Sequence, residues 1–252
     1  AIGLPLLYLN VPLHFDEGIY LTIGKQVASG ETLYLDFADH KPPSIFYLAA
    51  VIYQLFSNPV TAARVLTYTV IGISGLLVSH FGRGFCRKRA AQGAGVLFIL
   101  ISCLPHLDGF CFMTEHFAVL TLLIAAILLR HSSLYSDVVA GISLGVSVLF
   151  NQTVFLFGST IIAFHLVKLW YPENRNHGHI TESTKQILSI GIGFLGLNSI
   201  VFVALTSYSL LESTIYYSIV LPFTDYSTPF NAWGHILTLG TLLPVWLVSG
   251  GM

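Results

Sequence analysis

Two pairs of polar residues, at the two ends of one stretch, could carry chemistry in this chain. Asp16 and Glu17 are adjacent carboxylates, and His40 and Lys41 directly precede two prolines. A carboxylate at the edge of an apolar environment tends to have a raised pKa, which suits a general base. A lysine at the start of a helix attracts anions, because the helix dipole is positive there. The stretch Asp16–Pro43 therefore predicts proton abstraction at its beginning and phosphate binding at its end.

The rest of the chain is largely apolar. Of its 252 residues, 54% are hydrophobic and only 9% are charged, and the mean hydropathy is +0.77. Ordinary soluble domains contain about 25% charged residues, so a soluble fold of this size would lack the polar groups to cover its surface. Residues 16–43 nevertheless hold five of the twelve acids and two of the eleven Lys and Arg. The composition predicts a membrane protein, and the net charge of -1 gives no attraction to nucleic acid.

Apolar runs alternate with polar segments along the chain. The predicted spans are the tail of a first span at 1–13, then 61–81, 90–107, 116–129, a two-helix hairpin over 138–169 broken at residues 151–153, then 186–205 and a last span from 237. Polar loops are predicted at 168–185 and 206–234. The run Ser44–Phe56 would be about 20 Å long as a helix, too short for a hydrocarbon core of roughly 30 Å. It predicts a helix that lies at the membrane interface.

The distribution of charge gives the predicted bundle two sides. Eight of the eleven Lys and Arg fall in one set of turns, with four of them between Arg83 and Arg89, and nine of the twelve acids fall in the other set. If Ser44–Phe56 spanned the bilayer, residues 16–43 and Glu115 would face opposite sides, so the interfacial alternative is preferred. The positive-inside rule then places the basic turns in the cytoplasm and residues 16–43 outside the cell membrane.

The predicted fold class is all-α, a polytopic transmembrane helix bundle with interfacial helices in its first outer loop. Residues 1–252 form a single transmembrane domain. Because the chain begins and ends inside apolar runs, we expect it to be part of a longer protein whose first span is truncated here.

Two further residues on the acidic side are candidates for the site. Arg64, near the start of the span 61–81, could bind a second phosphate oxygen or anchor the helix to lipid headgroups. Glu115, near the start of the span 116–129, could act in chemistry or complement the helix dipole. His106, Asp108, Glu115 and His116 lack the spacing of a helical His-Glu-x-x-His metal site. The sequence therefore requires no cofactor, and a divalent metal stays open as an alternative.

The order of these residues resembles the first outer loop of the polytopic GT-C glycosyltransferases. The most similar branch (glycosyltransferase family 39) holds the protein O-mannosyltransferases and the aminoarabinose transferases that modify lipid A. The matching pieces are Asp16-Glu17, Tyr20, Gly30, Leu33-Tyr34, Asp36 and His40-Lys41-Pro42-Pro43, followed by Arg64, the basic turn 87–89, Thr114-Glu115 and the helix with Gly141 and Gly145. Where members often carry a lysine after that helix, this chain has Asn151-Gln152.

The resemblance implies a GT-C enzyme that moves a sugar from a polyprenyl-phosphate donor to a protein, lipid or glycan acceptor hydroxyl at the outer membrane face. It implies that Lys41 and Arg64 bind the donor phosphate. Asp16 is the first choice for the base and Glu17 for orienting the acceptor, and the reverse assignment stays open. Supporting roles fall to Tyr20, Tyr34, Asp36, His40 and Glu115. The alternative is a transporter or flippase of a lipid-linked sugar or small solute, which should carry ionisable residues at mid-span.

Overall fold

A computed structural model describes residues 9, 11–104, 109–131, 133–156, 160 and 177–224. These residues form helices and turns without a strand, apart from an isolated bridge between Leu33 and Phe37 that closes a turn. The elements are α2 (Phe15–Ala28), α3 (Ser44–Leu55), α4 (Pro59–Gly82), α5 (Lys88–Ser102), α6 (Thr114–Leu128), α7 (Leu134–Phe150), α9 (His177–Ser207), α10 (Leu211–Ile215), the π-helical turn η3 (Tyr216–Val220) and α11 (Leu221–Thr224). The predicted all-helical class is confirmed for the described residues.

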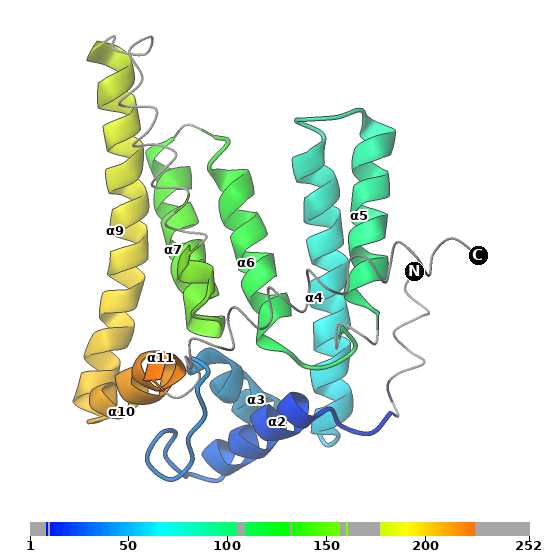
Figure 1. Cartoon of the computed structure of the whole chain (residues 1–252), viewed down its shortest axis with the longest axis vertical. Helices are drawn as coiled ribbons and strands as arrows, with labels where there is room; N and C mark the ends of the chain where they lie inside the picture. The colour runs from blue at the N-terminus through cyan, green and yellow to red at the C-terminus, as the bar shows by residue number, and fades with distance from the viewer. Residues whose placement is uncertain are drawn as a thin grey trace.

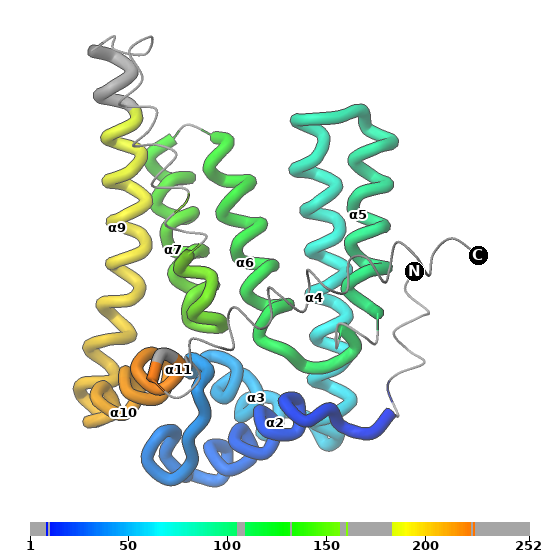
Figure 2. Tube along the Cα trace, viewed as in Figure 1, coloured from blue at the N-terminus to red at the C-terminus, as the bar shows by residue number. Residues whose placement is uncertain are grey.

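The helices fall into two groups. Helices α4, α5, α6, α7 and α9 run along the long axis of the molecule, whereas α2, α3, α10 and α11 lie across one end of them (Figure 1). The chain trace in Figure 2 shows that α4 and α6 begin at this end and that α5, α7 and α9 return to it. Side chains on the short crossing helices can therefore meet side chains at the ends of the long ones.

Charge separates along the long axis. We call the end crossed by the short helices the acidic end, because its described elements carry Asp16, Glu17, Glu31, Asp36, Asp39, Glu115 and Glu212. We call the opposite end the basic end, because the turns after α4 and α6 and the start of α5 carry Arg83, Arg87, Lys88, Arg89 and Arg130. The two sets of turns that the sequence distinguished by charge thus lie at opposite ends of one structure.

Two helices in the described ranges are long and apolar enough to cross a bilayer. They are α4, with 24 residues, and the 25-residue part of α9 from Ser183 to Ser207. Each is about 36 Å long, against a hydrocarbon core of roughly 30 Å. Helices α5, α6 and α7 have 15, 15 and 17 residues, or about 22–26 Å. The sequence predicted α5 to continue to Leu107, but it ends at Ser102, and residues 105–108 lie outside the described part.

Helix starts and ends follow local sequence signals. The Asn58 side chain accepts a hydrogen bond from the Thr61 N–H at 3.2 Å and Pro59 occupies the first position of α4, as is typical of a helix start. Helix α2 has Asp16 and Glu17 in its first turn, where carboxylates suit the helix dipole. It ends before Gly30, whose φ of +100° is a conformation that favours glycine.

Two predicted loops are partly wrong. Helix α9 begins at His177, inside the loop predicted at 168–185, and residues 168–176 lie outside the described part. Residues 211–224 form α10, η3 and α11 inside the loop predicted at 206–234. The buried positions Leu210, Thr214 and Ser218 recur every four residues, so one face of this tyrosine- and serine-rich segment packs as a helix.

Some of the other predicted elements agree with the structure, and others lie outside the described residues. The run Ser44–Phe56 that was predicted to lie at the interface forms a helix from Ser44 to Leu55. The first arm of the predicted hairpin ends at Phe150, so the polar break at 151–153 is confirmed. Residues 11–14 are not helical, so the prediction that the first span extends to residue 13 is wrong at its end. The remainder of the predicted first span, the second arm of the hairpin beyond Leu156 and the predicted last span lie outside the described residues, apart from Leu9 and Thr160.

Glycines bring the most closely packed helices together. A Cβ atom at Gly141 of α7 would collide with the Ile190 carbonyl oxygen of α9, and one at Gly193 would collide with the Val138 carbonyl oxygen. Large apolar side chains on the outer surface of α9, including Leu188 and Ile192, stay exposed. Close contact over small residues combined with an exposed apolar surface is typical of helices that pack within a membrane.

Candidate functional site

A buried ion pair joins α2 to α4. Arg64 Nη2 lies 2.6 Å from Glu17 Oε2 and Arg64 Nε lies 3.0 Å from Glu17 Oε1, and both side chains are 0% exposed. The Phe112 N–H also donates to Glu17 Oε1, at 3.2 Å. A bidentate arginine–carboxylate contact is strong and directional. The pair therefore locks the first turn of α2 to α4 and to the segment that leads into α6.

The other donors of Arg64 point to the backbone that enters α2. Nη1 donates to the carbonyl oxygens of Leu9 and Val11 at 3.0 and 2.7 Å, and Nη2 donates to that of Pro12 at 3.3 Å. A guanidinium group has five N–H donors, and these contacts together with those to Glu17 engage all five. This arrangement gives Arg64 and Glu17 a structural role. The contacts predicted for them with a phosphate and an acceptor would require the ion pair to open.

A second ion pair lies at the acidic end and is open to solvent. Lys41 Nζ lies 3.5 Å from Glu115 Oε1, with the Lys41 side chain 16% exposed and that of Glu115 49% exposed. Thr114 Oγ1 donates to Glu115 Oε2 at 3.0 Å, and Asn151 Nδ2 donates to Glu115 Oε1 at 2.9 Å. Three groups therefore hold the Glu115 carboxylate, and the lysine that pairs with it remains within reach of a ligand.

The backbone around Lys41 is fixed from several sides. Tyr34 Oη donates to the Lys41 carbonyl oxygen at 2.6 Å, and the Lys41 N–H donates to Asp39 Oδ1 at 2.9 Å. Gln152 Nε2 donates to the His40 carbonyl oxygen at 3.1 Å. Two buried prolines follow Lys41, and α3 begins immediately after them. The lysine is thus held at the start of a helix, as the sequence predicted.

Asp16 lies in the first turn of α2, half-buried beside the enclosed Glu17. Tyr20, one helical turn further, is buried and packs edge-on against Phe46 with the ring centroids 5.8 Å apart. Burial raises the pKa of the Tyr20 phenol, and the negative charges of Asp16, Glu115 and Asp39 raise it further. Asp16, Glu115 and Asp39 thus all lie within electrostatic range of the Tyr20 phenol. Asp16 and Glu115 therefore belong to the same charged region.

The remaining predicted residues lie at the edge of this region. The His40 Nδ1 atom lies 3.6 Å from Asp39 Oδ1. Asp36 is exposed, and its Oδ2 accepts a hydrogen bond from the Thr32 N–H at 2.7 Å, so it closes the turn that contains Tyr34. These two residues shape the loop at 29–43.

Asn151 and Gln152 join the site, although neither was predicted as a site residue. Asn151 donates to Glu115 and Gln152 donates to the His40 backbone. The signal that could have found them is the polar triplet Asn151-Gln152-Thr153 within a long apolar run, at the position where members of the similar family often carry a lysine. Amides inside an apolar stretch need hydrogen-bond partners.

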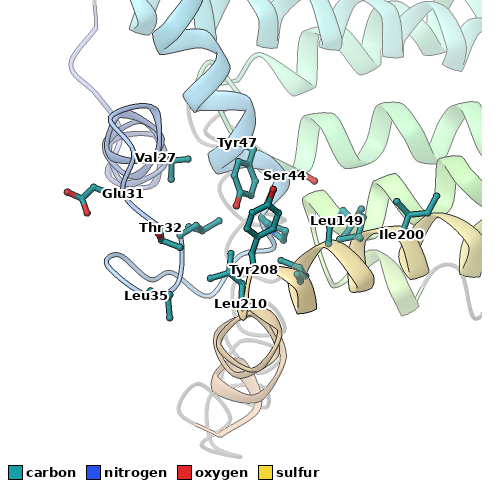
Figure 3. Close-up of a pocket in the computed structure, with 15 residues that line it drawn as sticks. Val27, Glu31, Thr32, Leu35, Ser44, Tyr47, Leu149, Ile200, Tyr208 and Leu210 are labelled. Atoms are coloured by element: carbon teal, nitrogen blue, oxygen red, sulfur yellow. The ribbon is translucent and has the colours of Figure 1, made fainter.

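An apolar groove opens at the start of α3, two residues beyond Lys41. It has a volume of about 830 Å³ and is lined by Pro43 and Ser44, by the loop at 31–35, and by the C-terminal half of α9. Figure 3 shows the Tyr47 and Tyr208 rings close together in this groove, with Leu149 and Ile200 along its far side. The groove therefore places a hydrocarbon-lined space next to Pro43 and Ser44, which closely follow Lys41 in the chain.

No family model, curated protein or solved structure matches this chain. Among the residues described above, no group of three His, Cys, Asp or Glu side chains lies close enough to hold a metal ion. The chemistry of the acidic end therefore has to be inferred from its own charged groups.

Proposed function

We propose that this chain is the membrane domain of a GT-C-like glycosyltransferase that moves a sugar from a polyprenyl-phosphate donor to an acceptor hydroxyl. The observation that carries the proposal is the position of Lys41. It is a partly exposed cation that is paired with Glu115. Pro43 and Ser44, which follow Lys41 by two and three residues, line an apolar groove at the start of α3. A phosphate on a long hydrocarbon chain needs a cation and an apolar surface side by side.

Lys41 stabilises the phosphate that leaves. An ammonium group has three N–H donors, and the contact with Glu115 occupies one direction, so a phosphate oxygen can approach from another. As the bond between the anomeric carbon and the phosphate oxygen breaks, its electron pair leaves with the phosphate. A fixed cation near the membrane surface stabilises that developing charge. The groove beside Pro43 and Ser44 accommodates the first part of the polyprenyl chain.

Asp16 is the base in this proposal. Its carboxylate takes the proton from the acceptor hydroxyl while the acceptor oxygen bonds to the anomeric carbon. Glu17 is less suited to this task, because Arg64 and the Phe112 N–H enclose its carboxylate. Glu115 positions Lys41, and Asn151 positions Glu115.

The proposal places the acidic end at the outer face of the cell membrane, with the long helices crossing the bilayer. The basic turns at the opposite end then face the cytoplasm, in agreement with the positive-inside rule. Tyr47, Val51 and Leu55 are exposed and recur every four residues along α3. An exposed apolar stripe of this kind supports a helix that lies in the membrane interface.

The test measures sugar transfer by the full-length protein in lipid vesicles, from polyprenyl-phosphate mannose and from polyprenyl-phosphate aminoarabinose. For whichever of the two donors the unmodified protein accepts, we expect Lys41→Ala and Asp16→Asn each to reduce kcat/KM by about 100-fold or more. Lys25→Ala is the matched control, because Lys25 is an exposed lysine in the last turn of α2. Full activity in both site variants would overturn the proposal.

A further inference from the structure

A second pocket lies beside Tyr34. It has a volume of about 660 Å³, and its wall includes three tyrosines, Tyr34, Tyr216 and Tyr217, together with Glu212 and Ser213. The remaining lining is aliphatic, and it includes no Lys or Arg among the described residues. The size lies within the range of about 300–1,000 Å³ that is typical of pockets for small molecules.

The three rings form a corner. Tyr34 and Tyr217 are stacked, with the ring centroids 6.1 Å apart and an interplanar angle of 10°. Tyr216 stands against Tyr217 at 82°, with the centroids 5.2 Å apart. Tyr34 is only 3% exposed and Tyr216 is 48% exposed. The corner therefore has a closed wall at Tyr34 and an open ring at Tyr216.

Two uncommon backbone conformations bring these rings together. Tyr34 has a φ of +66°, which is rare for a bulky residue, and Tyr216 and Tyr217 begin the π-helical turn η3. Both kinds of conformation occur frequently at functional sites. The Tyr34 phenol holds the arrangement through its bonds to the Lys41 carbonyl oxygen at 2.6 Å and to Ser218 Oγ at 3.1 Å.

We propose that this pocket binds a pyranose ring of the acceptor, so that the acceptor is a glycan or the sugar headgroup of a glycolipid. A pyranose has an apolar face of C–H bonds, which packs on an aromatic ring, and a rim of hydroxyls that donate to carboxylates. Tyr216 supplies the ring, and Glu212 and Ser213 supply hydrogen-bond partners. A lining with one carboxylate and no cation favours a neutral or amino sugar over a phosphorylated one.

The location of the pocket connects it to the proposed transfer. One face of Tyr34 lines the pocket, and its hydroxyl bonds to the backbone of Lys41. Tyr34 therefore connects the pocket that would hold the acceptor sugar to the backbone of Lys41. The role of this sugar as the acceptor rests on the proposed function. Binding of a sugar in the pocket does not depend on that function.

The experiment measures binding of fluorescently labelled mannotriose and chitotriose to the full-length protein in lipid nanodiscs. Glycoside detergents are avoided, because their sugar headgroups would compete. A second arm presents the same sugars as lipid-linked headgroups in vesicles and distinguishes a free glycan from a glycolipid. We expect at least one probe to bind, with Tyr216→Ala and Glu212→Gln each weakening binding by roughly ten-fold. Both side chains are exposed, so neither change should prevent folding.

Tyr135→Ala is the matched control, because Tyr135 is an exposed tyrosine in α7 at the basic end. Tyr216→Phe should bind as the unmodified protein does, since it keeps the ring. The proposal is overturned if no probe binds in either arm, or if Tyr216→Ala and Glu212→Gln bind as tightly as Tyr135→Ala. Sugar binding without any transfer would remove the proposed function and support the pocket, whereas transfer to a peptide hydroxyl without sugar binding would do the reverse.

Discussion

Tyr34 and Lys41 are joined by a hydrogen bond of 2.6 Å from the phenol to the backbone carbonyl. The contact crosses the loop at 29–43 and fixes the lysine from inside the fold. Tyr34→Phe keeps the stacked ring and removes only this bond and the one to Ser218. We expect it to lower the free energy of unfolding by about 1–2 kcal/mol. Transfer should fall by about ten-fold in kcat, because Lys41 is held less firmly. Unchanged kinetics in Tyr34→Phe would argue that the loop does not depend on this bond.

The same phenol gives a prediction for high pH. Burial raises the pKa of Tyr34, and the Ser218 hydroxyl lowers it by a smaller amount. A group whose pKa is higher in the folded state than in the unfolded state contributes stability below its unfolded pKa, here about 10, and that stability is lost as the pH rises further. Thermal unfolding followed from pH 7 to 11 should show a loss above about pH 10 that is smaller in Tyr34→Phe. An equal loss in both proteins would contradict the assignment.

The buried pair between Glu17 and Arg64 predicts a strong effect on stability. Glu17→Gln leaves a buried guanidinium without its counter-charge, and we expect a loss of about 3–5 kcal/mol in the free energy of unfolding. Arg64→Lys should be nearly as harmful, because an ammonium group cannot supply five donors in a plane. Thermal unfolding in nanodiscs measures both, with Lys25→Ala as the control. The double variant Glu17→Gln/Arg64→Met should recover part of the loss, and additive losses would show that the two charges are independent.

Two glycines of α9 offer a matched test of helix packing. Gly193 lies against the Val138 carbonyl oxygen of α7, whereas a Cβ atom at Gly196 would meet nothing within 4 Å. We expect Gly193→Ala to destabilise the protein by about 1–3 kcal/mol. Gly196→Ala should be neutral or stabilising by up to about 1 kcal/mol, because alanine favours a helix. Thermal unfolding of the two variants compares them directly. Similar melting temperatures would contradict a close contact between α7 and α9 at Gly193.

Native cysteines allow the proposed sidedness to be tested. Cys86 is exposed in the turn between α4 and α5 at the basic end, whereas Cys103 and Cys111 are buried. An impermeant thiol reagent added to intact cells should not label Cys86 until the membrane is opened. When Glu31→Cys is introduced into the Cys86→Ala variant, the thiol at this exposed position should react with the impermeant reagent while the membrane is still closed. The reverse pattern of labelling would invert the proposed orientation.

Much of the fold could be predicted because it depends on local composition. The limit of α3 follows from a largely apolar run of 13 residues, 44–56, and the polar break after α7 follows from three consecutive polar side chains. The contact between Glu17 and Arg64 could not be predicted, because nothing in the spacing of two residues 47 positions apart shows that they meet. The helical segment 211–224 was missed because its polar composition suggested a loop, although Leu210, Thr214 and Ser218, spaced four residues apart, are buried.

The site was predictable in part for the same reason. Lys41 and Glu115 were both recognised from the scarcity of charge, since any ionised group in an apolar chain is conspicuous. Their pairing depends on how the start of α6 approaches the loop at 29–43, which only the tertiary structure defines. Asn151 carries no charge and was not predicted as a site residue, yet its amide holds Glu115 in place.

The three bonds from Arg64 to the chain before α2 have an evolutionary consequence. Their acceptors are the backbone carbonyls of Leu9, Val11 and Pro12, so the side chains at these positions are free to vary without loss of the contact. An insertion or deletion there would move each carbonyl by about 3.3–3.6 Å and break the set. Relatives of this protein should therefore conserve the number of residues between this segment and Glu17 more strictly than their identity.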